Sequence, residues 1–230
     1  MFENLKEIRC KDCIVKSNLM FNLNDKELDI LCKNSTEIIF QKGEKIIKQG
    51  AFTQNIVFVK KGVVKIHLRG SIQKDEILKI EKGPVFVGVP DVFANNTHTY
   101  SITALEETKA CFIEYAGFEY LIENNGKFAL EIIKDLSLAT VKHYAFYVNK
   151  TQKQLTALFA DALIYFADII YKSDSFSLPL TRSELGEYIG TTRETVTKII
   201  HDFSVDKIIT VNGKKISLLN RNIIKKISGA

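Results

Sequence analysis

The spacing of apolar residues changes along the chain and divides it into three parts. Between residues 36 and 114, short runs of β-branched and aromatic residues, such as residues 56–59, recur between glycines. Many short strands separated by glycine turns indicate a closed or double-sheet β architecture, because glycine accepts a positive φ at tight corners. A short helix is expected before these strands, over residues 24–33, where Asn24 and Glu27 have the spacing of a capping box.

A long helix is predicted over residues 128–150, which contain no glycine or proline and place apolar side chains at helical spacing. Steps of four and three residues form a heptad-like seam on one face, which predicts that the helix joins two chains. The seam consists of Ile132, Leu136, Ala139, His143 and Phe146. A second apolar stripe is expected to pack on the β domain and consists of Leu130, Ile133, Val141, Tyr144 and Val148. A helix buried on all sides in one core is the alternative.

The C-terminal part contains short elements with clear start and stop signals. Thr181 and Glu184 have capping-box spacing and begin a helix that Gly190 ends. Thr191 or Thr192 then caps a second helix. Downstream, an Asn-Gly dipeptide between two apolar runs predicts a β-hairpin with a type I′ turn. Helix, glycine-containing turn, helix and hairpin together predict a winged helix-turn-helix.

The predicted fold class is therefore α+β, with three parts of different function. A β-barrel sensor domain is expected over residues 1–124, a dimerisation helix over 125–150, and the winged helix-turn-helix domain over 151–230. The last domain is expected to begin with a further helix over residues 154–171.

Composition agrees with a soluble globular protein, since 46% of the 230 residues are hydrophobic and 26% are charged. No apolar run approaches the roughly 18 residues of a membrane span, and the charged N-terminus is unlike a signal peptide. A cytoplasmic protein without a membrane partner is therefore expected. The net charge is +5, and residues 177–230 hold nine Lys and Arg against five Asp and Glu. A basic terminal module favours contact with the phosphate backbone of nucleic acid.

Residues 180–200 contain the sequence Leu-Thr-Arg-Ser-Glu-Leu-Gly and then Gly-Thr-Thr-Arg-Glu-Thr-Val. These segments closely resemble the helix-turn-helix of the catabolite activator/fumarate-nitrate regulator (Crp/Fnr) superfamily of transcription regulators. Glycine-containing segments between residues 40 and 65 resemble its sensor domain, so that the resemblance covers nearly the whole chain. It implies a double-stranded β-helix, which is the jelly roll of cyclic nucleotide-binding domains. It further implies a homodimer that binds an interrupted palindrome in double-stranded DNA, works with RNA polymerase and is not an enzyme.

The resemblance also implies roles for individual residues of the helix-turn-helix and the wing. Base reading is expected from Arg193, Glu194, Thr197 and Lys198. Arginine can form a bidentate bond to a guanine edge and glutamate can accept from a cytosine amino group, so these residue types suit the task. Phosphate contacts are expected from Thr181, Ser183, Thr192, Thr195, Lys214 and Lys215. The interior of the helix-turn-helix is expected to contain Ile189, Val196, Ile199 and Ile200.

The predicted effector pocket departs from the family pattern. Members that bind cyclic AMP carry Gly-Glu-Leu followed by Arg-Ser, whereas the matching positions here are Gly88, Val89, Tyr100 and Ser101. An anionic phosphate would therefore lack a charge-assisted hydrogen bond. Cyclic AMP is not expected to bind, and the effector stays unknown.

A redox sensor is an alternative, because Cys10, Cys13 and Cys111 match three ligand positions of the iron–sulfur branch of the family. However, Leu19 occupies the remaining position, and Cys32 is offset onto the apolar face of a predicted helix. A [4Fe–4S] cluster normally requires four thiolates. No cluster is therefore expected, and the three cysteines are at most weak metal-ligand candidates.

Two further alternatives depend on histidine. Haem would need an axial ligand, but the four histidines show no pattern that singles one out: His67, His98, His143 and His201. A cupin-type enzyme would need clustered histidines with a carboxylate, and the sequence has no such cluster. A cyclic-nucleotide or redox sensor module consequently remains the alternative to a DNA-binding regulator.

Overall fold

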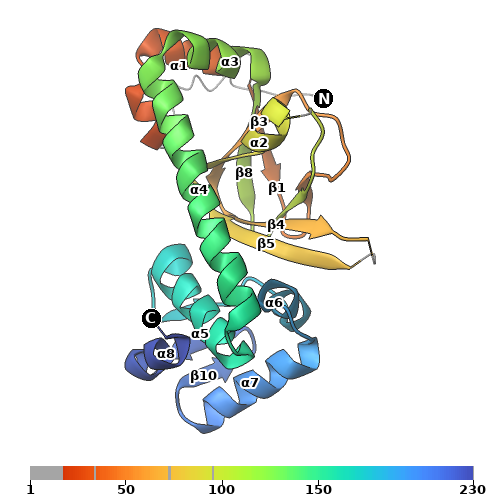
Figure 1. Cartoon of the computed structure of the whole chain (residues 1–230), viewed down its shortest axis with the longest axis vertical. Coiled ribbons are helices and arrows are strands. Elements are labelled where there is room, and N and C mark those ends of the chain that lie inside the picture. The colour runs from red at the N-terminus through yellow and green to blue at the C-terminus, as the bar shows by residue number, and fades with distance from the viewer. Residues whose placement is uncertain (1–17, 34, 72–73, 95, 230) are drawn as a thin grey trace, which may run out of the picture. The chain divides into compact units, whose positions relative to one another are not determined.

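The computed structural model describes residues 18–33, 35–71, 74–94 and 96–229. Figure 1 shows the long helix α4 (Gly126–Gln152) and the elements on either side of it in sequence. The β domain contains β1 (Thr36–Phe40), β2 (Lys45–Ile47), β3 (Asn55–Lys61), β4 (Val63–Arg69), β5 (Asp75–Lys82), β6 (Val85–Val87), β7 (Ser101–Ala104) and β8 (Thr108–Glu114). Its helices are the 3₁₀-helix η2 (Asn18–Asn22), α1 (Asp25–Cys32), α2 (Val89–Ala94) and α3 (Tyr115–Asn124).

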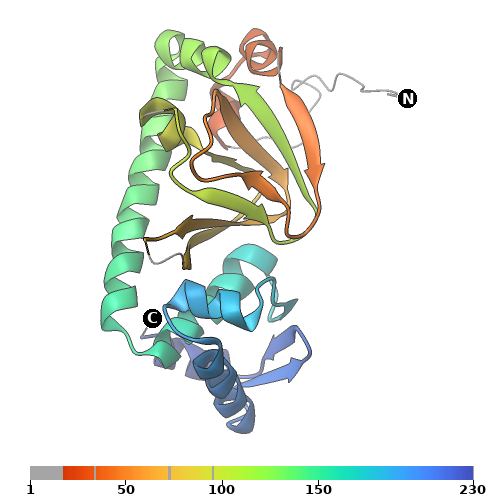
Figure 2. The same ribbon diagram turned by 90° about the vertical axis from the view of Figure 1, so that its right-hand side faces the viewer.

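The strands form two four-stranded sheets, in the orders β1-β8-β3-β6 and β2-β7-β4-β5. Figure 2 shows the two sheets facing each other, which is the double-sheet architecture that the glycine-separated strands predict. Residues 56–59 of β3 are all buried, since this strand is central in its sheet and is covered on both faces. The predicted jelly-roll fold is confirmed.

A chain of phenylalanine rings joins helices α3 and α4 to the sheet that contains β3 and β6. Phe58 on β3 lies 4.8 Å from Phe86 on β6, measured between ring centroids, and Phe86 lies 5.6 Å from Phe118 on α3. Phe118 in turn meets Phe128 on α4 edge to face at 5.3 Å. Such pairs are favourable beyond the area that they bury, so the first turns of α4 are anchored in the sensor core.

The C-terminal elements form a winged helix-turn-helix, as predicted. They are α5 (Leu155–Tyr165), the π-helical segment η3 (Phe166–Tyr171), β9 (Ser175–Ser177), α6 (Arg182–Ile189), α7 (Arg193–Val205), β10 (Ile209–Asn212), β11 (Lys215–Leu218) and α8 (Arg221–Ser228). The wing is a three-stranded sheet in the order β10-β11-β9. The sequence did not indicate β9 or α8, and the predicted helix over residues 154–171 changes to π-helix in its last six residues.

The wing turn differs by one residue from its prediction. Asn212 pairs with Lys215, so the two turn residues are Gly213 and Lys214 rather than Asn212 and Gly213. Gly213 has a φ of 61°, whereas Lys214 has no positive φ. A turn with glycine in its first central position and one positive φ corresponds to type II′ rather than type I′. Consequently Lys214 stands at the tip of the wing.

The chain divides into two compact units. The first extends to Val64 and resumes over Lys82–Thr140, and the second joins Lys65–Glu81 to the residues from Val141 onward. The second unit therefore contains most of the β4–β5 hairpin and the last turns of α4, besides the winged helix-turn-helix. No helix among the described residues is both long enough and apolar enough to cross a membrane.

Candidate functional site

Two glycines shape the helix-turn-helix. A Cβ added at Gly186 on α6 would lie 2.7 Å from the carbonyl oxygen of Thr191, so only glycine lets the turn approach α6 this closely. Gly190 ends α6 with a φ of 81°, a left-handed cap that also favours glycine. The turn and α7 are therefore fixed to α6 by backbone packing. The four apolar residues expected inside the motif are all buried: Ile189, Val196, Ile199 and Ile200.

Local hydrogen bonds show which threonine caps helix α7. Thr192 is the N-cap, and its side chain accepts from the backbone N–H of Thr195 at 3.3 Å. Glu194 is exposed in the first turn, and its own backbone N–H, followed by the Thr192 hydroxyl, lowers its pKa below the usual value. The Glu194 carboxylate is therefore ionised at neutral pH and can act as an acceptor for a base amino group.

The structure places the four predicted base-reading residues on the first turns of α7, but not equally. Arg193, Glu194 and Lys198 are exposed. Thr197 is half-buried, and its hydroxyl donates to the carbonyl oxygen of Arg193 at 2.9 Å and accepts from Arg182 at 3.4 Å. The Thr197 hydroxyl is therefore held within the chain, and the other three side chains are the better placed to contact a base.

Three of the six predicted phosphate-binding residues line a groove of about 390 Å³ between α6, α7 and the wing. Its rim includes Thr181, Ser183 and Lys214 together with Arg193. Arg182, which the sequence analysis did not select, lines the same groove; its position beside a helix N-cap was the available signal. Lys215 and Thr192 are exposed and Thr195 is half-buried, and none of these three lines the groove.

The five residues of the predicted dimer seam on α4 differ in their surroundings within the chain. Ile132 is buried in the core of the sensor domain, and Leu136 packs against that core. Phe146 stacks on Tyr188 of α6 with ring centroids 5.6 Å apart. Ala139 is half-buried and His143 is exposed. Three of the five seam residues therefore also make contacts within the chain.

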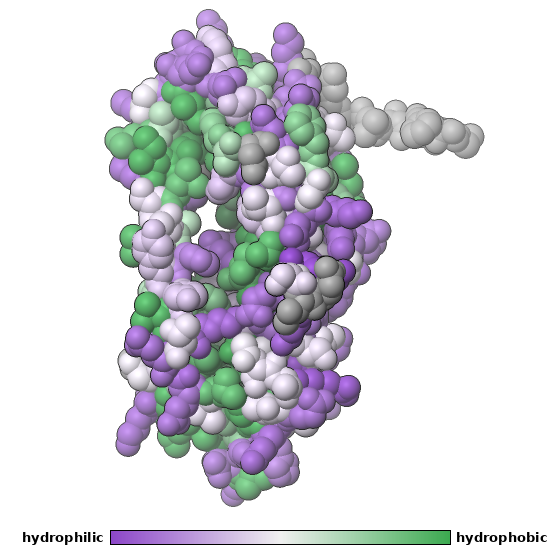
Figure 3. All heavy atoms as spheres, turned by 45° about the vertical axis from the view of Figure 1, so that its right-hand side comes forward, coloured by the Kyte–Doolittle hydropathy of each residue, from purple (hydrophilic) through white to green (hydrophobic). Residues whose placement is uncertain are grey.

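The opposite face of α4 carries the apolar stripe that the sequence analysis assigned to the β domain. All of its side chains are exposed, by 45% to 65%. The stripe consists of Leu130, Ile133, Val141, Tyr144 and Val148. Figure 3 shows hydrophobic side chains at intervals along the left-hand border, where α4 runs. A row of large apolar side chains at helical spacing on a solvent-facing helix is typical of a helix–helix interface.

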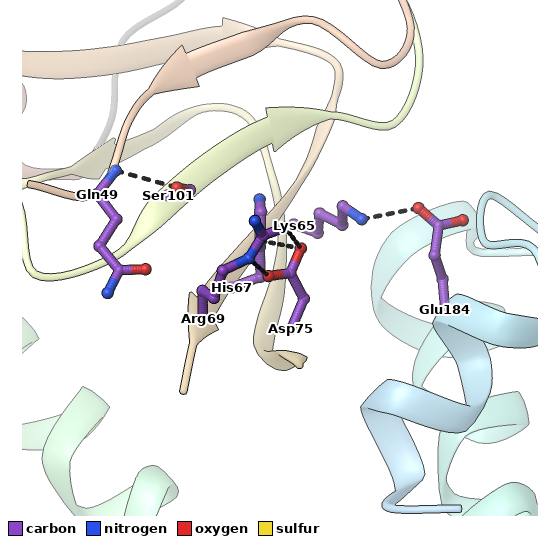
Figure 4. Close-up of polar contacts among 7 residues, drawn as sticks. All are labelled: Gln49, Lys65, His67, Arg69, Asp75, Ser101 and Glu184. Carbon is purple, nitrogen blue, oxygen red and sulfur yellow. Dashed lines mark hydrogen bonds and ion pairs between the residues drawn. The ribbon is translucent and has the colours of Figure 1, made fainter. Parts of the chain in front are cut away.

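The predicted effector pocket lies where β6 passes into α2 and where β7 begins. Gly88 has a φ of 83°, and Val89 is buried at the first position of α2. Ser101 is also buried, and its hydroxyl accepts from the backbone N–H of Gln49 at 3.0 Å (Figure 4). Burial, and then the negative charge of Asp91, raise the pKa of Tyr100, which also hydrogen-bonds the backbone of Gly88. Tyr100 is therefore a neutral phenol in this pocket.

A buried carboxylate beside the pocket escaped the sequence analysis. Asp91 on α2 is only 3% exposed, accepts from the Thr99 hydroxyl at 2.6 Å, and lies 3.3 Å from Nδ1 of His98. His98 is thus not an isolated histidine, nor is His67, which lies 3.7 Å from Asp75.

The cysteine candidates are only partly described. Cys10 and Cys13 lie outside the described residues. Cys111 on β8 is a half-buried free thiol whose Sγ lies 3.8 Å from a carboxylate oxygen of Glu37. Cys32, predicted to lie on the apolar face of its helix, is disulfide-bonded and half-buried. The expectation that the chain holds no iron–sulfur cluster therefore stays a prediction.

Comparisons with known proteins agree with this arrangement. Residues 159–227 match the Crp-like helix-turn-helix domain, and residues 37–125 match the cyclic nucleotide-binding domain. The fumarate and nitrate reduction regulatory protein of Vibrio cholerae is 25% identical to this chain over 232 residues, which cover 96% of this chain and 91% of that protein. The protein of the same name from Escherichia coli K12 is 25% identical over 238 residues, with the same coverage.

Solved structures are similar over most of the chain. FixK2 from Bradyrhizobium japonicum superposes with a TM-score of 0.76 at 19% identity and covers 85% of this chain and 98% of its own. A putative Crp/Fnr-family transcriptional regulator from Eubacterium rectale also gives 0.76, at 14% identity, and covers 93% of this chain and 99% of its own. At such low identities these similarities establish the fold.

Proposed function

This chain belongs to the Crp/Fnr family of DNA-binding transcription regulators, and from that premise we propose that it works as a homodimer on an interrupted DNA palindrome. The proposal rests on the observation that two features of the chain are both exposed. One is the apolar stripe on α4, and the other is the uncovered first turn of α7. Two recognition helices related by a two-fold axis match two inverted half-sites about one helical turn apart.

The dimer interface in this proposal is the stripe of Leu130, Ile133, Val141, Tyr144 and Val148. A second copy of the same helix suits it, because an apolar face that repeats every three or four residues packs on an equal face. We assign functional roles to residues 1–124 as sensor, 125–150 as dimerisation helix and 151–230 as DNA-binding domain. RNA polymerase as a partner and the cytoplasm as location follow from family membership as further proposals.

DNA recognition in this proposal has two components. Arg193, Glu194 and Lys198 contact base edges in the major groove, and Thr197 supports them through its bond to Arg182. The groove between α6, α7 and the wing receives the phosphate backbone through its hydroxyl and basic rim. Contacts of the second kind fix the register without reading sequence.

The wing should contribute affinity but no base preference. Lys214→Ala removes one exposed cation from the wing tip, and we expect weaker binding to every duplex, with the salt dependence of log K reduced by about one unit. Binding titrations over a range of salt concentrations, on specific and scrambled duplexes, measure this. A changed base preference in Lys214→Ala would mean that the wing, rather than α7, reads the sequence.

Cyclic AMP should not be the effector. Val89 and Tyr100 supply no charge to ribose or phosphate, so an anionic phosphate would lack a charge-assisted hydrogen bond. Isothermal titration calorimetry with millimolar cyclic AMP is expected to show no binding heat. Micromolar affinity would contradict this and would require a cation from another part of the chain in the phosphate site.

A further inference from the structure

Helix α6 is held at both ends by side chains that lie outside the helix-turn-helix. At its N-terminal end, Nζ of Lys65 on β4 lies 2.8 Å from Oε1 of Glu184 (Figure 4). At its C-terminal end, Lys150 of α4 contacts the carboxylate of Glu76 on β5 and lies 3.4 Å from the carbonyl oxygen of Glu187. All five residues belong to the second compact unit.

Each carboxylate oxygen of Glu184 accepts a hydrogen bond from a different part of the chain. Its Oε2 accepts from the backbone N–H of Thr181 at 2.7 Å and so closes the capping box of α6. Its Oε1 accepts from Lys65. Burial alone would raise the pKa of Glu184, but the hydrogen bonds from Lys65 and Thr181 outweigh burial and lower it. The helix cap is therefore joined to strand β4 by an ionised carboxylate.

The ion pair is well shielded from water. The Lys65 side chain is 11% exposed and the Glu184 side chain 23%. Removing one partner of such a pair leaves an uncompensated charge in a poorly solvated place, which is far more costly than removing an exposed pair. The β4–β5 hairpin behind it is itself braced, since Arg69 on β4 donates to Asp75 on β5 at 2.7 Å (Figure 4).

The end of α4 fixes the other end of α6. A Cβ at Gly190 would lie 3.0 Å from Cε of Lys150, so the Lys150 side chain rests directly on the turn of the helix-turn-helix. Tyr165 of α5 adds a hydrogen bond of 2.6 Å to the carbonyl oxygen of Ile80 on β5. Because Gly186 packs α6 against the turn that begins α7, whatever orients α6 also orients α7.

We propose that Lys65 is a positioning residue for DNA reading: through Glu184 it holds α6, and with it α7, in the orientation that an operator with two half-sites requires. The inference rests on the proposed function, because orientation matters most when two recognition helices must meet two half-sites at a fixed spacing. Lys65 touches no DNA in this account, and its side chain points to α6.

The chain offers a closely matched control. Lys60 on β3 forms an ion pair with Glu37 on β1, with side chains 12% and 24% exposed, but this pair lies wholly within the sensor unit. Lys65→Met and Lys60→Met each remove one shielded cation from the β domain while keeping a long apolar stem. Lys65→Arg keeps the positive charge that pairs with Glu184, so it should retain binding to the two-half-site duplex. If only the packing of the Lys65 side chain mattered, Lys65→Arg would not retain that binding.

The DNA probe is the duplex that the wild-type chain enriches from a random pool, compared with its single half-site and with spacers one base pair shorter and longer. We expect Lys65→Met to bind the two-half-site duplex about tenfold more weakly and to discriminate less between spacers, because misaligned helices lower the effective concentration for the second contact. Half-site affinity should stay unchanged. Lys60→Met and Lys65→Arg should behave as wild type.

Hydrogen exchange on the DNA-free protein gives an independent readout. Lys65→Met, but not Lys60→Met, should speed exchange of the α6 amides, because their local opening loses a tether. The proposal is wrong if the two methionine variants agree in both measurements, or if Lys65→Met weakens half-site and full-site binding equally. If wild type enriches no two-half-site sequence, the proposed function fails, and the exchange experiment still decides whether Lys65 holds α6.

Discussion

Replacing Ile133 with aspartate is expected to split the dimer into monomers. Ile133 is 59% exposed within the apolar stripe on α4, so in the proposed dimer the new carboxylates would lie in an apolar interface. An unpaired charge in such surroundings costs several kcal/mol. Sedimentation equilibrium should therefore show a monomer, and affinity for a two-half-site duplex should fall on the order of a hundredfold or more as the second contact is lost.

Leu136→Asp is the matched control on the same helix. Leu136 packs against the sensor core on the opposite face, so its replacement should lower the thermal stability of the sensor domain, while Ile133→Asp should leave that stability nearly unchanged. If Ile133→Asp stays dimeric and Leu136→Asp gives a stable monomer, then the seam with Leu136, rather than the exposed stripe, joins the two chains.

Glu194→Ala is expected to relax base preference at one base pair in each half-site. The Glu194 carboxylate is exposed in the first turn of α7 and ionised, so it can accept from a base amino group in the major groove. Losing such a contact should cost about 1–3 kcal/mol per half-site on the preferred sequence. Competition binding with every single-base variant of the operator measures both the loss and the position at which preference changes.

Asp202→Ala supplies the control for charge. Asp202 is an exposed acid on the same helix, two turns further on, and its removal changes the net charge by the same amount. Any general gain in attraction to the phosphate backbone should therefore be common to both variants. If Glu194→Ala keeps the wild-type base preference, or if Asp202→Ala alters it equally, then Glu194 does not read a base.

Local signals explain why the helix-turn-helix could be predicted in detail from sequence. Thr181, Glu184 and Thr192 cap helices through contacts within three residues, and Gly190 adopts the left-handed conformation that its position requires. Such interactions depend on nearest neighbours in the chain, so residue type and spacing are sufficient to identify them. The wing turn was displaced by one residue because strand register depends on cross-strand pairing, which the dipeptide alone does not fix.

The two faces of α4 could not be assigned to their partners from the sequence pattern. Both apolar stripes have helical spacing, and spacing alone does not say which partner each stripe meets. The structure shows that Ile132 reaches the phenylalanine core while Ile133 remains exposed. The Lys65–Glu184 and Asp91–His98 pairs could not be predicted from the sequence for a similar reason. Their members are 119 and seven positions apart, and residue type at such separations does not indicate contact.

We propose above that two copies of this chain read inverted half-sites with α7. The most direct measurement is selection of duplexes from a random pool by the wild-type chain, followed by sequencing and by sedimentation of the complex with the enriched duplex. We expect an inverted repeat with one fixed spacing and two chains bound per duplex. Enrichment of a lone half-site or a direct repeat with one chain per duplex, or no enrichment at all, would contradict it.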